Sequence, residues 1–585
     1  MQNGNYILIL HTHLPWMLHH GIYPAGIDWV NEAVAECYIP LLNVFNDLLN
    51  EGIPPNVTLD ISPVLCEQLA KPDFQQFFIN YCDARIDAAR KDHLDFLHWG
   101  YDPHHIWLTE FWENFYTARK NDFINKYNQS IVGALRDLQD KNAIEIMTCG
   151  ATHGYLPLLG TDESINLQIA TAIENYEKYF GRHPRGIWLP ECGYRPGYDW
   201  QSFIPVSPFN EKHYRPGIEQ FLYKHNLEYF VIDEKLIQNS TPIGAFDIER
   251  KFFNSIDSPY FQPVPWNFDK SAMRSYLVAS SDKVEYGYAA ELSRHHDLSM
   301  LVWSGEVGYP GEPDYLDFHK RHLNSWLRYW RVTDNKADMM YKTLYHPDWT
   351  QKKIDLQSNH FIHNLENSIN YYHNLTGKFA TLTTPFDTEL FGHWWFEGPE
   401  FIRAVIRGLH HSPWVKIVKA SEQLDILKPQ EVVRLPEGSW GVNNDHTVWM
   451  NDGNKWTWEM IYNDEKRFGE LLTQFPYLTG NSNEDINPNE ESKILKRIIL
   501  QALRELMLTQ SSDWQFLIYT NASKDYAEQR FFFHHSDFNR LCDLALKFAA
   551  EHNLTNDEWL YITEIEERDN IFPELKLENW KQLEW

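Results

Sequence analysis

The sequence predicts an α/β protein, in which a parallel β/α barrel is followed by a mainly helical C-terminal domain. Seven short apolar runs, typical of buried strands, recur over the first 420 residues with helical patterns between them. A polar or aromatic cluster follows each run, and a parallel barrel gathers its functional side chains at the carboxyl ends of its strands. Beyond Lys419 the strand signals fade and helical periodicity predominates.

The strands and helices can be placed along the chain. Among the helices that we expect are 31–49 and 163–179 in the barrel, and 491–508 and 538–552 beyond it. The connections 71–142 and 233–293 are too long for plain crossovers, so we expect insertions there. The expected domains are the barrel at 1–420 and the helical domain at 421–585. The expected strands are 6–10, 57–61, 143–148, 186–189, 228–232, 299–303 and 379–383.

The composition excludes several functional classes. A formal net charge of −29 argues against nucleic acid and anionic membranes as partners, because either would favour a basic face. The six cysteines are scattered without a CxxC pair, which is typical of reduced thiols in a cytoplasmic protein. The first apolar run is too short for a signal peptide, and no run approaches the ~18 residues of a membrane span. We therefore expect a cytoplasmic location, while the oligomeric state stays open.

Two carboxylates stand directly after predicted strands. Glu191 follows residues 186–189 in GIWLPECGY, and Asp387 follows residues 379–383 in TTPFDTELFGHWW. Glycosidic cleavage needs two facing carboxyl groups, one that attacks or activates water and one that protonates the leaving oxygen. Apolar surroundings would raise the pKa of one acid, as a proton donor requires. The alternative is that a chain with 81 acidic residues has some at strand ends by chance.

Three histidines also follow predicted strands. His11 and His13 are two residues apart, so an extended backbone directs both rings to the same side, and His153 follows residues 143–148. Three interpretations remain open for these rings. They are hydrogen bonding to sugar hydroxyls, ligation of a metal in a metal-dependent hydrolase, and hydrogen bonding as ordinary interior groups.

Aromatic side chains are abundant, with 23 Trp, 31 Tyr and 34 Phe. They either fill large cores or form sugar-binding surfaces, because flat rings stack on the apolar faces of pyranose units. Together with His393, several tryptophans indicate a pocket with aromatic walls and few polar groups. These are Trp188, Trp303, Trp394 and Trp395, with Trp440 and Trp449 further on.

Five segments carry a family resemblance: HTHLPW, GATHGYLPLL, GIWLPECGYRPG, VWSGEVGYPGE and PFDTELFGHWWFEGPEF. In order and spacing they resemble the sequence regions of glycoside hydrolase family 57. The similarity extends from residue 6 to about residue 540. Three segments, ATHGYLPLL, LPEGSWG and SSDWQF, are similar to the 1,4-α-glucan branching enzymes of that family rather than to its amylases.

The resemblance implies an incomplete (β/α)7 barrel and a helical C-terminal domain that contributes to the substrate cleft. It also implies a retaining double displacement on α-1,4-glucans, which forms α-1,6 branches in glycogen biosynthesis. Glu191 would be the nucleophile and Asp387 the general acid and base. Amylose, amylopectin and glycogen are the implied partners, and no metal or organic cofactor is implied. The substrate contacts expected from the residues and the resemblance are His11, His13, Trp29, His153, Arg294, Trp303, Gly311, His393, Trp394, Trp440, Trp449 and Asp513.

Two positions depart from the family pattern. Branching enzymes of the family commonly carry a tyrosine at a loop tip where this chain has Ile243, and a polar contact expected after Asp513 falls on Ala522. Loss of the tyrosine would favour hydrolysis or weak branching, unless Tyr260 compensates. An α-glucan hydrolase or a 4-α-glucanotransferase on the same scaffold is therefore the alternative. The segment 233–265 is expected to cover the site.

Overall fold

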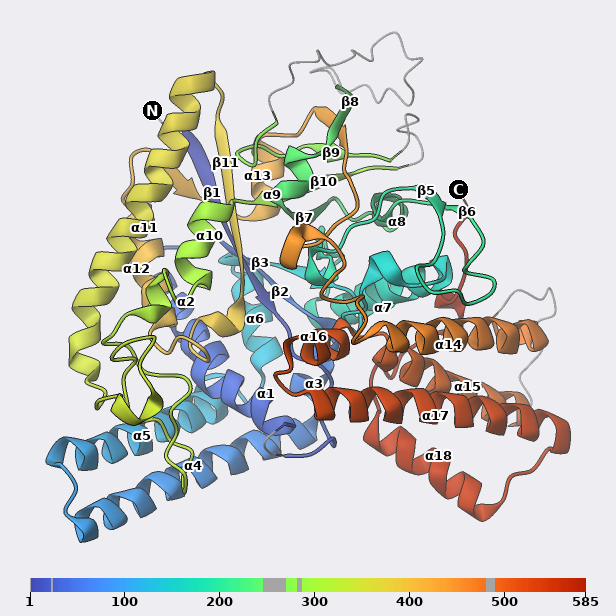
Figure 1. The fold of residues 1–585 in the computed structure, drawn as a ribbon, viewed down its shortest axis with the longest axis horizontal. Helices are drawn as coiled ribbons and strands as arrows, with labels where there is room; N and C mark the ends of the chain where they lie inside the picture. The colour runs from blue at the N-terminus through green and yellow to red at the C-terminus, as the bar shows by residue number, and fades with distance from the viewer. Residues whose placement is uncertain (1, 23–24, 246–269, 281–286, 480–489, 585) are drawn as a thin grey trace.

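The structure is a computed structural model that describes residues 2–22, 25–245, 270–280, 287–479 and 490–584 (Figure 1). Its centre is a barrel of seven parallel strands in the order β11-β1-β2-β3-β4-β7-β10, which β10 and β11 close by pairing Arg294 with Thr383. The predicted incomplete (β/α)7 barrel is confirmed. The barrel strands are β1 (Gly4–Thr12), β2 (Val57–Ile61), β3 (Ile144–Cys149), β4 (Gly186–Trp188), β7 (Tyr229–Asp233), β10 (Ala289–Arg294) and β11 (Ala380–Asp387).

Six of the seven predicted strands are confirmed, and the one at 299–303 is wrong. Those residues lie in helix α10 (His296–Trp303), and the sixth barrel strand is β10, whose sequence AAELSR has no β-branched residue. A five-residue apolar run does not distinguish a buried helix from a strand. Because β10 belongs to the barrel, the second predicted insertion ends before residue 289 instead of at 293.

Helices surround the barrel and form the C-terminal region, and all four helical segments named from the sequence are confirmed. Among the described residues, no helix combines the length and apolar composition needed to cross a membrane. The helices are α1 (Ile27–Ala33), α2 (Ile39–Asn50), α3 (Pro63–Ala70), α4 (Pro72–Trp99), α5 (Pro103–Asn121), α6 (Ile131–Asp140), α7 (Asp162–Phe180), α8 (Ile218–Lys224), α9 (Glu234–Gln238), α10, α11 (Pro347–Thr376), α12 (Gly398–His410), α13 (Ala420–Ile426), α14 (Lys455–Gln474), α15 (Glu490–Thr509), α16 (Ser512–Thr520), α17 (Lys524–Glu551) and α18 (Asn556–Arg568).

The first predicted insertion, 71–142, consists of α4, α5 and α6. Helices α4 and α5 pack against each other as the long hairpin at the lower left of Figure 1. Gly100 ends α4 with a φ of 66°, a left-handed conformation that favours glycine at a helix C-terminus. The hairpin thus extends from the barrel without belonging to its β/α repeat.

The second predicted insertion contains short strands that prolong the barrel sheet. β8 (Thr241–Ala245) pairs with β13 (Glu431–Arg434), and β13 pairs with β9 (Leu277–Val278), which is antiparallel to β10. Ile243 lies in β8 as the unpaired residue at the register shift with β13, so its predicted position at a loop tip is wrong. Tyr260 and most of the predicted cover lie outside the described residues. β12 (Val415–Ile417) pairs with β1, and β5 (Tyr198–Trp200) pairs with β6 (His213–Arg215).

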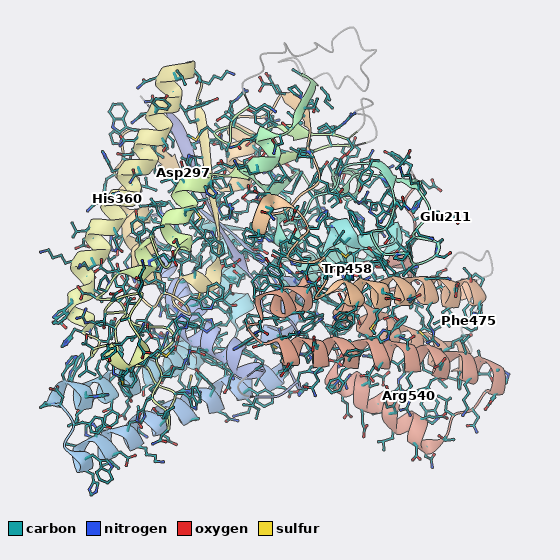
Figure 2. All side chains as sticks on the ribbon, viewed as in Figure 1. Glu211, Asp297, His360, Trp458, Phe475 and Arg540 are labelled. Carbon is teal, nitrogen blue, oxygen red and sulfur yellow. The ribbon has the colours of Figure 1, made fainter. Side chains whose placement is uncertain are left out.

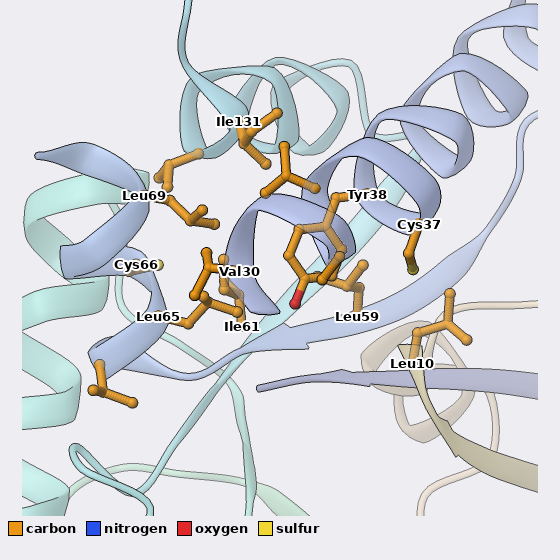
Figure 3. Close-up of a cluster of buried hydrophobic side chains, with 14 of the residues drawn as sticks. Leu10, Val30, Cys37, Tyr38, Leu59, Ile61, Leu65, Cys66, Leu69 and Ile131 are labelled. Atoms are coloured by element: carbon orange, nitrogen blue, oxygen red, sulfur yellow. The ribbon is translucent and has the colours of Figure 1, made fainter. Parts of the chain in front are cut away.

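Apolar packing on both sides of the barrel wall fixes the strands. All nine residues of β1 are buried, as expected for a strand flanked by parallel neighbours and covered by helices. Figure 3 shows Leu59 and Ile61 of β2 within one such cluster, together with Tyr38 from the π-helical turn between α1 and α2.

The helical C-terminal region shares a core with the barrel. Trp458 of α14, labelled in Figure 2, is fully buried, and its indole nitrogen donates a hydrogen bond to the Trp449 carbonyl oxygen at 2.7 Å. The same core contains Phe230 of β7 and Trp514 of α16. The start of α16 is thereby fixed against the carboxyl ends of the barrel strands.

Candidate active site

Glu191 lies in a tight turn, Pro190–Cys192, directly after β4. Its backbone has a φ of 62°, a strained conformation for a residue other than glycine and one that recurs at functional sites. Trp440 Nε1 donates to Glu191 Oε2 at 2.9 Å, and Ser512 Oγ donates to Oε1 at 3.0 Å. Burial raises the pKa of Glu191 to about 7, although the bond from Trp440 opposes this shift.

Asp387 is the last residue of β11 and is in register with His11 of the neighbouring strand β1. Burial raises the pKa of Asp387 well above its ordinary value, and the charges of Glu389 and Glu191 raise it further. The proton affinity of Asp387 therefore depends on the charge of Glu191. Two coupled carboxyl groups of this kind suit an acid and a nucleophile.

The three predicted histidines form one cluster. His13 stacks on His153 with ring centroids 3.8 Å apart, and His11 stacks on Trp188 at 4.5 Å. His13 Nδ1 lies 2.7 Å from Ser62 Oγ, and its Nε2 lies 2.9 Å from an Asp513 carboxylate oxygen. This brings together three predicted histidines and the predicted Asp513.

A hydrogen-bonded chain connects Asp60 with Glu191. His11 Nδ1 lies 2.9 Å from Asp60 Oδ1, His11 Nε2 lies 3.2 Å from His153 Nε2, and His153 Nδ1 lies 2.7 Å from Ser512 Oγ. Burial lowers the pKa of both histidines, to about 3 for His11, so each ring carries one proton at neutral pH. Burial also raises the pKa of Asp60 well above its ordinary value, which favours the protonated form of this carboxyl.

Metal ligation by this cluster competes with these hydrogen bonds. His11, Cys149 and His153 lie close enough together to hold an ion, and so do His13, His153 and Asp513. Both ring nitrogens of each histidine, however, already have a protein partner. An ion would have to displace bonds that hold Glu191 in place.

Trp440 lies beside Glu191 and close to three further predicted residues. Its ring is edge-on to Trp188 at 5.0 Å and to Trp303 at 5.7 Å, and the Arg294 guanidinium lies 6.0 Å from its centroid. Arg294 Nη2 also lies 2.6 Å from Asp233 Oδ2 at the end of β7. The structure thus brings Trp303, Arg294 and Trp440 into the site.

Two other predicted tryptophans pack against tyrosines. Trp29 on α1 is half-buried and lies edge-on to Tyr526 at 6.5 Å. Trp449 is buried and stacks on Tyr155 at 4.6 Å, behind the segment that carries His153. A substrate contact by either ring stays a prediction.

The remaining predicted substrate contacts follow α10 and β11 along the chain. His393 is buried after β11, with its Nε2 3.7 Å from a Glu32 carboxylate oxygen, whereas the adjacent Trp394 is exposed. An added Cβ at Gly311 would lie 2.2 Å from the Gly305 carbonyl oxygen, so close backbone packing already requires glycine there. Ala522 is exposed between α16 and α17. Substrate contacts at His393, Trp394 and Gly311 stay predictions.

Sequence reasoning missed three side chains that hold the site together. Asp60 is a carboxylate inside the apolar run VTLDI, and this unusual placement was the available signal. Ser62 follows the same strand. Ser512 stands beside the predicted Asp513, but serine is too common at helix starts for its type to single it out.

The comparisons with known proteins agree with this geometry. Residues 7–436 match glycosyl hydrolase family 57, and residues 483–580 match the C-terminal region of 1,4-alpha-glucan branching enzymes. The chain belongs to glycosyl hydrolase family 57.

Within the family, several relatives are named as branching enzymes. The chain is 34% identical to 1,4-alpha-glucan branching enzyme TK1436 of Thermococcus kodakarensis, over 97% of this chain and 77% of that protein. The crystal structure of the branching enzyme from Pyrococcus horikoshii has a TM-score of 0.85 at 34% identity, covering 100% of this chain and 98% of that one. The α-amylase AmyC from Thermotoga maritima has a TM-score of 0.78 at 27% identity, with full coverage of both chains.

Proposed function

We propose that the chain is a 1,4-α-glucan branching enzyme with Glu191 as nucleophile and Asp387 as general acid and base. The observation that carries the proposal is the placement of two half-buried carboxyl groups at the carboxyl ends of β4 and β11, where the charge of Glu191 raises the pKa of Asp387. The match of residues 483–580 to the C-terminal region of branching enzymes supports branching as the reaction.

In the first step, Asp387 donates its proton to the glycosidic oxygen of an α-1,4-glucan while Glu191 attacks the anomeric carbon. The departing chain takes the proton as its 4-hydroxyl, and a covalent glycosyl-enzyme remains. The bonds from Trp440 and Ser512 fix both carboxylate oxygens of Glu191, so little reorganisation is needed for attack.

In the second step, ionised Asp387 removes the proton from a 6-hydroxyl of an acceptor chain. The acceptor oxygen displaces Glu191 and forms the α-1,6 bond, which returns both carboxyl groups to their starting states. Water competes for the same intermediate. Trp440 and Ser512 both come from the region beyond residue 420, so that region has the position to exclude water and hold the acceptor.

An α-glucan hydrolase is the second candidate. Similarity to the α-amylase AmyC over the whole length of both chains favours it. Hydrolysis requires the same two carboxyl groups and differs only in the acceptor. The proposal of branching therefore depends on the fate of the glycosyl-enzyme.

The deciding experiment is incubation with amylose, followed by proton NMR of the anomeric region and a reducing-end assay. New α-1,6 signals with few new reducing ends are expected. Rising reducing ends without α-1,6 signals would assign the chain to the hydrolases. Glu191→Gln and Asp387→Asn serve as controls, since each should abolish both signals.

The physiological setting that we propose is glycogen biosynthesis in the cytoplasm, with amylose, amylopectin or glycogen as the glucan. All six cysteines are free and buried, which supports a reducing compartment.

A further inference from the structure

A row of four parallel aromatic rings lies on the surface where the first turns of α5 and α11 meet. Trp107 stacks on His104 with centroids 5.4 Å apart, His104 on His346 at 3.9 Å, and His346 on Trp349 at 4.0 Å. The three interplanar angles are 14°, 7° and 10°. In each pair the tryptophan follows the histidine by three residues, which places both rings on one helix face. We refer to these four residues as the ring row.

Backbone contacts hold the ring row in place. The Asp102 side chain accepts a hydrogen bond from the His104 amide at 2.8 Å and caps α5. His104 Nε2 donates to the Tyr345 carbonyl oxygen at 2.7 Å, which joins the start of α5 to the residue before His346. Burial and the neighbouring His104 lower the pKa of His346.

The two tryptophans remain open to solvent. Trp107 is 44% exposed and Trp349 is 45% exposed, although burial of an aromatic side chain would contribute about 1.5–3 kcal/mol. The Arg331 guanidinium lies 5.6 Å from the Trp349 ring. Its Nη1 donates to the Pro313 carbonyl oxygen and to Asp314 Oδ1, so Nε and Nη2 supply the donors at this end of the row. An aromatic surface that is already ordered and lies beside hydrogen-bond donors suits a ligand with apolar faces and hydroxyl groups.

We propose that the ring row is a second α-glucan-binding site, separate from the catalytic centre. The inference rests on the proposed function, because that function makes an α-glucan polymer the ligand at hand. Figure 1 shows α5 at the lower left, away from α16, whose first turn contacts Glu191. A second site of this kind would keep one part of a long or branched glucan attached while another part reacts, and would thereby raise the local substrate concentration.

The test uses full-length protein carrying Glu191→Gln, so that no turnover occurs during binding. Affinity electrophoresis in gels containing glycogen should show binding about tenfold weaker in the double variant Trp107→Ala/Trp349→Ala, which corresponds to ~1.4 kcal/mol. Trp107→Phe/Trp349→Phe should retain most of the affinity, since the ring faces remain. The matched control is Trp414→Ala, since Trp414 is 43% exposed but lies between α12 and β12, outside the ring row. This control should bind glycogen as the parent does.

Three results would overturn the inference. The first is unchanged glycogen affinity in the double alanine variant with an unchanged melting temperature. The second is an equal loss of turnover on a short maltooligosaccharide, measured with Glu191 intact, because the row would then act through the catalytic centre. The third is a change of oligomeric state in light scattering without a change in glycogen affinity, which would make the row a protein contact. If glycogen binding depends on the row but amylose gives no α-1,6 bonds, the proposed branching function alone fails.

Discussion

The hydroxyl of Ser512 donates to Glu191 Oε1 at 3.0 Å and joins the first turn of α16 to the turn after β4. One hydroxyl proton cannot serve two bonds, so His153 Nδ1 must be the donor in its 2.7 Å contact with Ser512. His153 Nε2 is then an acceptor, His11 Nε2 a donor, and His11 Nδ1 an acceptor from protonated Asp60. A single chain of donors therefore runs from Asp60 to the nucleophile.

Ser512→Ala should lower kcat by about tenfold or more, since hydrogen bonds to charged groups contribute ~1.5–3 kcal/mol. The bond lowers the pKa of Glu191 in the native enzyme, so its loss should move the acidic limb of kcat/KM to higher pH. The measurement is a pH–rate profile on a soluble maltooligosaccharide. Ser512→Thr keeps the hydroxyl and should retain the native acidic limb. An unshifted limb in the alanine variant would contradict the assignment.

The variant Asp60→Asn tests the direction of the hydrogen bonds that connect Asp60 with Glu191. If Asp60 is protonated, an asparagine amide can replace its O–H as the donor to His11 Nδ1, and kcat should stay within about threefold of the native value. Asp60→Ala removes the donor and leaves His11 Nδ1 unsatisfied in a buried site, at a cost of ~1–3 kcal/mol. Comparable losses of kcat in both variants, at matched thermal stability, would indicate that Asp60 is ionised and that the hydrogen bonds run in the opposite direction.

The barrel was largely predictable because six strands carry their own apolar signal, followed by polar clusters. β10 was not, because AAELSR has no β-branched residue and becomes a strand through its pairing with β7. The nearby run at 299–303 is equally apolar but is helical in α10. Tertiary pairing, which a local pattern does not report, decides between the two segments.

The candidate site was predictable where chemistry and strand ends coincide, as at Glu191, Asp387 and the three histidines. Ser512 lies 321 residues from Glu191 in sequence, so only folding reveals their contact. Ile243 shows the reverse error. Its place in a motif indicated a loop tip, whereas it lies in strand β8 at the bulge between Pro242 and Gly244, which both pair with β13.

Removal of divalent metals should leave the activity unchanged. Each ring nitrogen of His11, His13 and His153 already has a hydrogen-bond partner in the protein. A metal ion bound by these rings would therefore break the hydrogen bonds that orient Glu191. Dialysis against a chelator, followed by metal analysis and the amylose assay, checks this expectation. Activity that disappears on chelation and returns with one added metal would favour the metal-dependent hydrolase instead.

Glu191→Gln should stabilise the protein at alkaline pH and have no such effect in acid. The pKa of Glu191 is about 7 in the folded chain, above the 4.5 of an unperturbed glutamate, so the folded state binds the proton more tightly. Stability from this group is complete below pH 4.5 and is lost as the pH rises through about 7. At pH 8 the charge of Glu191 should cost about 3 kcal/mol, which the neutral amide avoids. Melting temperatures of both proteins between pH 4 and 8 measure the difference, with Glu459→Gln on the exposed face of α14 as the control. If the difference in melting temperature between the two proteins does not increase with pH, the pKa of Glu191 is not raised in the folded state.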